Sequence, residues 1–331
     1  MSRALVARAP TRLDFGGGWT DVPPYSDREG GAVCNLAIAR YATVTVASGG
    51  HIAARTGSSN AADDRLLRAA LRRSLNSNVE ARLSNDFPVG AGLGGSSAAG
   101  VALAGALAEF AGSPLAPHAL ATLSRETEVE ELGMPGGYQD HFAAAFGGAL
   151  LLTFENGVVG VEQIALSADI GAALARRSVL VYTGESRISG DTITAVRDAY
   201  LAGERHVVDA LARMKALARE MATALRAEDL DTLGALVGEH WTHQRALHSA
   251  IPTARIDAIV GAAARSGALG TKALGASGGG CVLAFAEDGR EDELTRALAP
   301  LGERLTFTVD TKGFDVLAVF EGQDSFQGEH E

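Results

Sequence analysis

The segment best suited to chemistry is a glycine-rich loop, residues 88–99, which runs directly into a small-residue helix predicted over residues 96–110. Backbone N–H groups at the start of a helix are unpaired and carry the positive end of the helix dipole, so they bind anions such as phosphate. Ser96 and Ser97 fall in the first turn, where a hydroxyl caps the helix or binds a metal ion. A simple helix cap is the alternative, but four glycines within six positions favour a phosphate site.

Two common nucleotide-binding motifs do not fit this loop. No Lys follows its last glycine, as a Walker A motif requires. No acidic residue closes a following strand about 20 residues on, as a dinucleotide-binding motif requires. Any phosphate site here therefore depends on backbone groups and hydroxyls.

A second segment, residues 9–21, places Arg12, Asp14 and Asp21 beside a run of three glycines. Carboxylates next to exposed backbone suit a polyhydroxy ligand, because an ionised carboxylate accepts hydrogen bonds from two hydroxyls at once. Surface turn residues are the alternative explanation for this segment.

A third segment begins with an acidic helix predicted over residues 119–132 and ends in a glycine turn. The turn presents Asp140 at the start of another apolar helix, where a carboxylate can act as a base or as a magnesium ligand. Glu126, Glu128 and Glu130 lie on the acidic helix. Most of them are expected to face solvent, and one at most is expected to be functional.

A fourth segment, residues 272–285, has three consecutive glycines before a strand of buried character. Such a loop either packs against a ligand or an opposite domain, or is a tight turn into the strand.

The surrounding pattern predicts an α+β protein. Strands are expected at residues 4–7, 31–37, 42–47, 79–85, 149–154, 178–183, 305–309 and 316–320. Further helices are expected at residues 63–74, 191–225 with a break at Gly203, 230–248, 253–265 and 291–301. The pattern loosens around residues 163–175, which predicts two domains, residues 1–170 and 171–331.

Composition narrows the class of protein. Apolar residues make up 47% of the 331 residues, which excludes a disordered or fibrous chain. The net charge of −11 argues against nucleic-acid binding but permits a small phosphorylated ligand. Cys34 and Cys281 are expected to be buried thiols, although a single bond between them stays open. The longest apolar run is too short to span a bilayer and no signal-peptide pattern is present, so we expect a cytoplasmic protein without a membrane partner.

In combination the segments resemble the GHMP kinases, a family named for galactokinase, homoserine kinase, mevalonate kinase and phosphomevalonate kinase. Residues 9–21 resemble the family's first motif, residues 88–99 its nucleotide-phosphate loop and residues 272–283 its third motif, in the expected order. The resemblance implies an α+β fold of two domains, with ATP and a sugar in the cleft between them. Residues 17–24 and 30–38 are similar to fucokinase, and residues 138–141 and 182–187 are similar to fucokinase and to heptose 7-phosphate kinase, enzymes that phosphorylate an anomeric hydroxyl.

The resemblance also implies roles for individual residues. Asp140 matches the catalytic aspartate, and Arg12 would balance charge beside it. The ATP-binding residues it implies are Pro88, Gly90, Gly92, Leu93, Gly94, Gly95, Ser96, Ser97 and Ala98. Ser96 and Glu128 would hold Mg²⁺, with Ser97 and Glu130 as alternates. The sugar-binding residues it implies are Gly18, Thr20, Asp21 and Gly137, with Arg187 as a candidate for a phosphate tail. His141 departs from the family, which usually has Gln after the catalytic aspartate, and its own role stays open.

Three functions follow from these expectations. The first is an ATP-dependent kinase that phosphorylates the anomeric hydroxyl of a fucose-like hexose. The second is the same reaction on a heptose 7-phosphate, which gives the 1,7-bisphosphate. The third is a non-catalytic regulator that binds nucleotide or sugar, against which the retention of Arg12, Asp21, Ser96 and Asp140 weighs. The expected partners are ATP and a small sugar, and the protein is expected to be a monomer or a homodimer.

Overall fold

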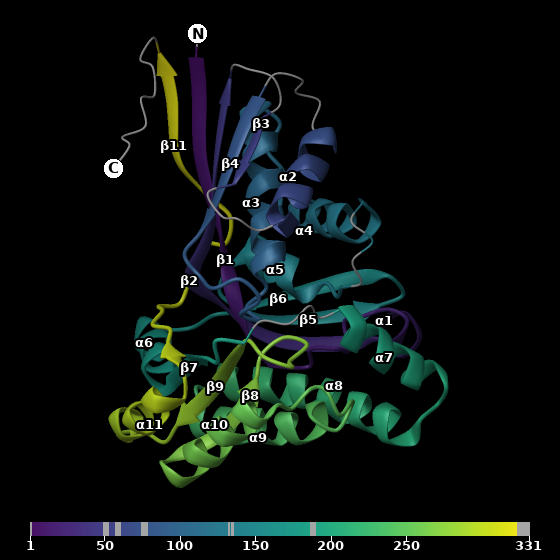
Figure 1. Ribbon diagram of the computed structural model, residues 1–331, viewed down its shortest axis with the longest axis vertical. Helices are drawn as coiled ribbons and strands as arrows, with labels where there is room; N and C mark the ends of the chain where they lie inside the picture. Colours follow the sequence, from purple (N-terminus) through teal and green to yellow (C-terminus); the bar gives the residue numbers. More distant parts are fainter. Residues whose placement is uncertain are drawn as a thin grey trace.

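The computed structural model describes residues 2–48, 53–56, 61–73, 79–131, 133, 136–185 and 190–322. Two long strands, β1 (Ser2–Gly16) and β2 (Gly31–Ser48), pair antiparallel and run from the end that carries the N-terminus into the middle of the molecule (Figure 1). β2 pairs with β4 (Val79–Asn85) over its second half and with β5 (Ala149–Glu155) over its first half. The same strand therefore contributes to both halves of the molecule.

The first sheet has seven strands. Its order is β11-β1-β2-β4-β3, and β5 and β6 extend it from the first half of β2; the added strands are β3 (Ala53–Thr56), β6 (Val158–Ile164) and β11 (Asp315–Gly322). All pairs are antiparallel except β3 with β4. β11, near the end of the chain, pairs with β1, so the first sheet contains residues from both ends of the chain. The domain boundary near residue 170 stays a prediction.

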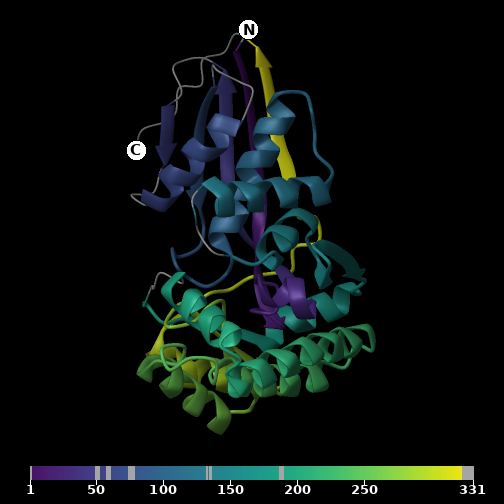
Figure 2. The same cartoon turned by 90° about the vertical axis from the view of Figure 1, so that its right-hand side faces the viewer.

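Helices cover one face of this sheet in the half that carries the N-terminus (Figure 2). They are α2 (Ala61–Arg73), α3 (Gly95–Phe110), α4 (Pro117–Glu126), a π-helical turn (Thr127–Glu131) and α5 (Gln139–Phe146). A short helix, α1 (Tyr25–Glu29), lies between β1 and β2 in the chain. α3 is rich in Ala and Gly and is buried along most of its length, so it packs closely against the sheet.

The second half is built around a four-stranded antiparallel sheet. Its order is β10-β7-β9-β8, made of β7 (Ser178–Tyr182), β8 (Ala268–Ala273), β9 (Cys281–Ala286) and β10 (Glu303–Arg304). The helices of this half are α6 (Ala168–Arg177), α7 (Gly190–Leu201), α8 (Arg205–Arg226), α9 (Leu230–Gln244), α10 (Ala254–Arg265) and α11 (Glu291–Leu298), and a 3₁₀ turn (Ala299–Leu301) follows α11. No described helix is long and apolar enough to cross a membrane.

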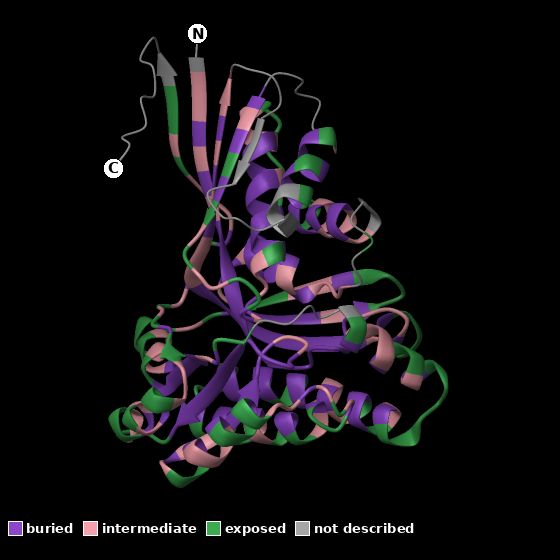
Figure 3. Cartoon of the chain, in the orientation of Figure 1, coloured by how far each residue is buried: buried purple, intermediate pink, exposed green. Residues whose placement is uncertain are grey.

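Strand β9 shows how the core holds the second half together. Leu283 and Phe285 pack toward the first sheet, whereas Val282 and Ala284 pack toward α10 and α11, and all are fully buried. Figure 3 shows buried residues continuous through the centre of the molecule, where the two halves meet. Cys34 and Cys281 are both free, buried thiols, and burial raises the pKa of each.

The sequence expectations for helices are confirmed for α2, α3, α9 and α10, and for the break at Gly203 between α7 and α8. The strand predicted at residues 4–7 is present but longer than expected, because β1 continues to Gly16; it lies between β2 and β11 and not at an edge of the sheet. Pro10, which lacks an N–H group, is tolerated where the register shifts between Pro10 and Thr11. Residues 31–37 and 42–47 form one strand rather than two.

Two expectations near the second sheet are also corrected. Residues 305–309 form no strand of their own: β10 ends at Arg304, and Val309 makes a single bridge to Ile38. Residues 163–175, where the sequence pattern loosens, contain the end of β6 and most of α6. Ser167 caps α6 by accepting a hydrogen bond from the Ile170 amide.

Candidate active site

The glycine-rich loop reaches α3 through three left-handed glycines. Gly90, Gly92 and Gly94 have φ of 71°, 73° and 74°, a conformation that L side chains rarely adopt. Gly94 is the residue that precedes the first turn of α3. The N–H groups of that first turn have no partners within the helix, so they are available as hydrogen-bond donors to an anion.

The loop is anchored to the protein through its carbonyl groups. The Ala91 carbonyl accepts a hydrogen bond from the Cys281 amide at 2.8 Å, and the Leu93 carbonyl accepts one from the Arg12 amide at 3.0 Å. The Gly92 carbonyl accepts a third from the Arg12 guanidinium at 2.7 Å. These bonds fix the loop from β1 and β9, so its position is set before any ligand binds.

Arg12 and Asp140 form an ion pair at the start of α3. The Nε and Nη2 atoms of Arg12 both contact Oδ1 of Asp140, at 2.7 and 2.6 Å. In the described part of the chain, Oδ2 of Asp140 has no hydrogen bond or ion pair. A Cβ atom on Gly94 would lie 3.0 Å from the Asp140 carboxyl carbon, so glycine at position 94 lets this carboxylate lie against the helix end.

Glu128, on the π-helical turn, lies beside the same helix end. Its Oε1 accepts a hydrogen bond from Ser96 at 2.5 Å, and its Oε2 accepts one from Ser97 at 3.2 Å. His141 Nε2 lies 2.9 Å from Oε2. Burial works against ionisation of Glu128, but the contacts from His141 and the two serines outweigh it and lower the pKa of this carboxyl.

His141 is the site residue whose role the sequence left open, and the structure places it in a buried chain of hydrogen bonds. Its Nδ1 lies 3.0 Å from Ser124 Oγ, on α4. The two ring nitrogens therefore contact polar groups on two different elements, Glu128 through Nε2 and Ser124 through Nδ1. The ring therefore fixes the orientation of the Glu128 carboxylate.

The donor set at this position fits Mg²⁺. Magnesium prefers oxygen ligands and in kinases is usually held by one or two protein groups together with substrate phosphates. The Ser96 hydroxyl is exposed, and the adjacent Glu128 carboxylate supplies two more oxygens. Within the described residues no cluster of three or more His, Cys, Asp or Glu could hold a metal by itself. The side chain of the alternate ligand, Glu130, lies outside the described part.

Asp21 connects the first motif to α5. Its Oδ2 accepts hydrogen bonds from the amides of Tyr138 and Gln139, at 2.8 and 3.0 Å, and so caps the helix that carries Asp140. Burial raises the pKa of Asp21 to about 6, and the charge of Asp140 adds to the rise. The two amide bonds lower the pKa but do not compensate for the burial.

A pocket of about 440 Å³ opens in front of these carboxylates, and we call it the carboxylate pocket. Its lining residues are Arg12, Asp14, Gly18, Trp19, Asp21, Val22, Gly137, Gln139, Asp140, Ile193, Gly275 and Ala276. A Cβ atom on Gly137 would lie 2.0 Å from Asp21 Oδ2, so only glycine leaves room for that oxygen. Of the residues expected to bind a sugar, the structure brings Gly18, Asp21 and Gly137 together here.

Two further residues expected to bind a sugar are not among those that line this pocket. The Thr20 hydroxyl is fully buried and donates toward the carbonyls of Gly17 and Ala32, at 2.7 and 3.0 Å, which locks the glycine turn. A contact from its side chain to a ligand stays a prediction. Arg187 lies outside the described residues.

Lys272 and Asp14 form a fully buried ion pair that the sequence did not indicate. Lys272 Nζ lies 3.1 Å from Asp14 Oδ2 and 3.3 Å from the Phe15 carbonyl oxygen. Burial lowers the pKa of Lys272, and the charge of Asp14 acts in the opposite direction. The two residues are 258 positions apart, so only the packing of β8 against β1 reveals the pair.

The fourth segment, residues 272–285, packs directly on the glycine-rich loop before α3. A Cβ atom on Gly92 would lie 2.6 Å from the Leu274 carbonyl oxygen, and one on Gly275 would lie 3.1 Å from the Gly92 Cα. Of the two explanations that the sequence left open for this segment, the close approach to an opposite loop is the one observed. Gly92 and Gly275 permit this distance because neither carries a side chain.

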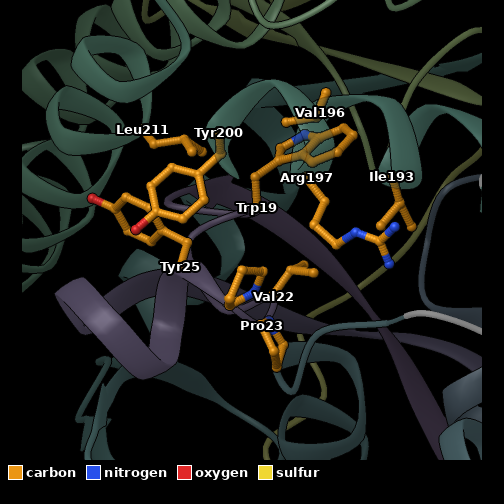
Figure 4. Close-up of a pocket in the computed structure, with 10 residues that line it drawn as sticks. Trp19, Val22, Pro23, Tyr25, Ile193, Val196, Arg197, Tyr200 and Leu211 are labelled. Atoms are coloured by element: carbon orange, nitrogen blue, oxygen red, sulfur yellow. The ribbon is translucent and has the colours of Figure 1, made fainter. Parts of the chain in front are cut away.

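An aromatic pocket adjoins the carboxylate pocket and shares Trp19, Val22 and Ile193 with it (Figure 4). The remaining lining residues are Pro23, Pro24, Tyr25, Val196, Arg197, Tyr200 and Leu211. Tyr25 and Tyr200 meet edge to face with ring centroids 5.3 Å apart. Arg197 extends from α7 alongside Ile193 and is the one cation among these residues.

Comparison with known proteins assigns this arrangement to a class. Residues 60–148 match the family model for the GHMP kinases N terminal domain, and residues 221–302 match the model for the GHMP kinases C terminal domain. The chain therefore belongs to the GHMP kinase family. It is a phosphotransferase that acts on an alcohol group, and the family's phosphate donor is ATP.

Several individual members of the family are similar to this chain over most of its length. The chain is 29% identical over 318 residues to D-glycero-alpha-D-manno-heptose 7-phosphate kinase of Campylobacter jejuni, with 89% of this chain and 93% of that protein covered. It is 27% identical to L-fucokinase/L-fucose-1-P guanylyltransferase of Bacteroides fragilis, with 93% of this chain covered but only 38% of that longer protein. A solved structure of a D-glycero-D-manno-heptose 1-phosphate kinase from Bacteriodes thetaiotaomicron superposes with a TM-score of 0.75 and 25% identity, covering 97% of this chain and all of that one.

Proposed function

We propose that the protein is an ATP-dependent sugar kinase that transfers the γ-phosphate to the anomeric hydroxyl of its acceptor. One observation carries the proposal. Asp140 lies against the anion-binding end of α3, and Arg12 holds only one of its two carboxylate oxygens. A hydroxyl in the carboxylate pocket would therefore meet a free carboxylate oxygen next to the site for the phosphate.

The chemistry assigned to each residue follows from this geometry. The amides of residues 94–97 would bind the transferring phosphate, because phosphoryl transfer needs positioning and charge neutralisation more than covalent help. Asp140 Oδ2 would accept the proton of the attacking hydroxyl or orient that hydroxyl. Arg12 would keep Asp140 in place and balance charge beside the phosphate. Ser96 and Glu128 would hold Mg²⁺, which neutralises phosphate charge when bound.

The first candidate acceptor is a free hexose of the fucose type. The residues that line the carboxylate pocket include polar side chains, among them Asp14, Asp21 and Gln139, and apolar side chains, which are Trp19, Val22, Ile193 and Ala276. Carboxylates and amides suit ring hydroxyls, whereas the apolar side chains suit a carbon-rich edge.

The second candidate acceptor is a heptose 7-phosphate. It is favoured by the similarity to the Campylobacter jejuni enzyme, which extends over nearly the whole of both chains. The aromatic pocket would give such a substrate room beyond the ring, and Arg197 would meet its phosphate. Arg187 is a further candidate for that contact.

The experiment is an ADP-release screen with fucose, galactose, mannose and heptose 7-phosphate, followed by ³¹P NMR of the product. We expect sugar-dependent ADP release and an anomeric phosphate. ADP release that no sugar accelerates, or a phosphate on another carbon, would refute the proposal. Arg197→Ala separates the two acceptors, because it should weaken only the phosphorylated sugar. Arg205→Ala is the matched control, since Arg205 is 94% exposed on α8 and lines neither pocket.

A further inference from the structure

Two oxygen atoms of residues that line the carboxylate pocket have no hydrogen-bond donor within the described part of the chain. They are Oδ1 of Asp14 and Oε1 of Gln139. Asp14 is 2% exposed and Gln139 is 7% exposed, so bulk water cannot fully replace the missing donors. Buried polar atoms are nearly always hydrogen-bonded, so these two oxygens require a partner that the described residues do not supply.

The side chains of Asp14 and Gln139 both lie close to Gly18. A Cβ atom on Gly18 would lie 2.4 Å from Asp14 Oδ2 and 2.9 Å from Gln139 Nε2. Gly18 itself lines the pocket. A side chain at position 18 would therefore collide with both groups, so only glycine fits between them.

Asp14 is held in the same way as Asp140. A buried cation contacts one oxygen of each carboxylate: Lys272 contacts Oδ2 of Asp14, and Arg12 contacts Oδ1 of Asp140. Asp14 Oδ1 is buried without a partner among the described residues, and the bonds to the partly exposed Asp140 carboxylate in that part of the chain go to its Oδ1 atom. A fixed carboxylate with one unpaired oxygen is a strong acceptor for a hydroxyl group, because it loses little side-chain entropy on binding.

We propose that Asp14 and Gln139 form a specificity subsite that binds the acceptor sugar through hydroxyls other than the one that is phosphorylated. The inference rests on the proposed function. Asp14 Oδ1 accepts a hydrogen bond from one such hydroxyl, and the Gln139 amide, which can both donate and accept, binds the same hydroxyl or its neighbour. The subsite selects sugars that carry a hydroxyl at this position.

A buried water is the competing explanation. Asn35 is the cross-strand partner of Asp14, is fully buried, and also has unpaired amide atoms. A water molecule between Asn35 and Asp14 would satisfy Oδ1 without any sugar. In that case changes at Asp14 would alter stability and leave sugar preference unchanged.

The test compares the best sugar from the screen with its mono-deoxy analogues, using kcat/KM. We expect the wild-type enzyme to reject at least one analogue by about 10- to 100-fold, because removal of that hydroxyl leaves a buried acceptor unpaired. Asp14→Asn and Gln139→Leu should each reduce that ratio to within about threefold at the same ring position. KM for ATP should stay unchanged in both variants.

Controls keep the outcomes separate. Asp310→Asn changes a buried carboxylate that binds the amides of Lys312 and Gly313 outside both pockets, and it should keep the wild-type pattern. Gln139→Leu leaves the Asp14–Lys272 pair intact, so it tests the subsite even if Asp14→Asn fails to fold. Folded variants that keep the full wild-type discrimination at every position would overturn the subsite alone. A wild-type enzyme that phosphorylates no sugar would overturn the proposed function and the subsite with it.

Discussion

The Asp21 carboxylate is expected to reduce the stability of the protein at neutral pH. Its pKa rises from an ordinary value of 3.8 to about 6 in the folded protein, chiefly because of burial. One pKa unit corresponds to about 1.4 kcal/mol, so the buried charge lowers the free energy of unfolding by about 3 kcal/mol once Asp21 is ionised in both states. Asp21→Asn removes the charge but keeps an oxygen that can accept from the amides of Tyr138 and Gln139.

The sign of the pH dependence follows from the order of the two pKa values. Below about pH 4 the carboxyl is protonated in both states, and the variant and wild type should be equally stable. Between about pH 4 and pH 6 only the unfolded state releases its proton, so wild-type stability falls relative to the variant as pH rises. Above about pH 6 the difference should reach a plateau of about 3 kcal/mol in favour of Asp21→Asn.

Urea unfolding followed by circular dichroism at pH 4.5, 6 and 8 measures this difference. Asp310→Asn is the control, because Asp310 also accepts amide hydrogen bonds but lines neither pocket. If Asp21→Asn were less stable than wild type at pH 8, or if the difference did not change with pH, burial would not be the dominant influence on Asp21. The variant should also lose activity, because the amide no longer presents a full negative charge to the pocket.

Substitutions at four other positions test the remaining parts of the site. Asp140→Asn should lower kcat by about 10²- to 10⁴-fold while ATP affinity, measured by calorimetry, stays within about twofold; unchanged turnover would remove Asp140 from the chemistry. Ser96→Ala should raise the Mg²⁺ concentration for half-maximal activity by about tenfold, whereas Ser97→Ala, at a buried hydroxyl, should mainly lower the melting temperature; the reverse result would make Ser97 the ligand. His141→Ala should destabilise the protein by about 1–3 kcal/mol and weaken Mn²⁺ binding measured by electron paramagnetic resonance, and His141→Gln should restore part of both. Equal Mn²⁺ affinity in all three proteins would show that His141 does not position Glu128.

The sequence was sufficient for the parts of the site that depend on local chain order. The loop at residues 88–99 and the helix after it are adjacent in the chain, so glycine content and small residues predict them together. The approach of Asp140 to Arg12 required the family resemblance, because the two residues are separated by 128 positions and meet only when α5 packs on β1.

What the sequence did not reveal lies in long-range pairing. Strand β1 looked short because Arg8, Pro10 and Arg12 interrupt its apolar pattern. Arg12 becomes a core residue only because Asp140 and the Gly92 carbonyl neutralise and bind its guanidinium. A buried charge whose partner is distant in sequence produces no hydrophobic periodicity from which its burial could be predicted. The same reasoning applies to Lys272 and Asp14.

The distribution of charge explains how a protein with a net charge of −11 can bind ATP, which is itself negatively charged. At the end of the site where we propose that phosphate binds, the N-terminus of α3 supplies partial positive charge, and Glu128, beside Ser96, would hold a cation there. The carboxylates of Asp14, Asp21 and Asp140 line the other side, where sugar hydroxyls would donate hydrogen bonds and no negative group is expected near the ring. Arg12 and Lys272, both buried, each contact one oxygen of their own carboxylate and offset the charge of Asp140 and Asp14. Local placement, not the total charge, therefore decides which ligand each side of the pocket accepts.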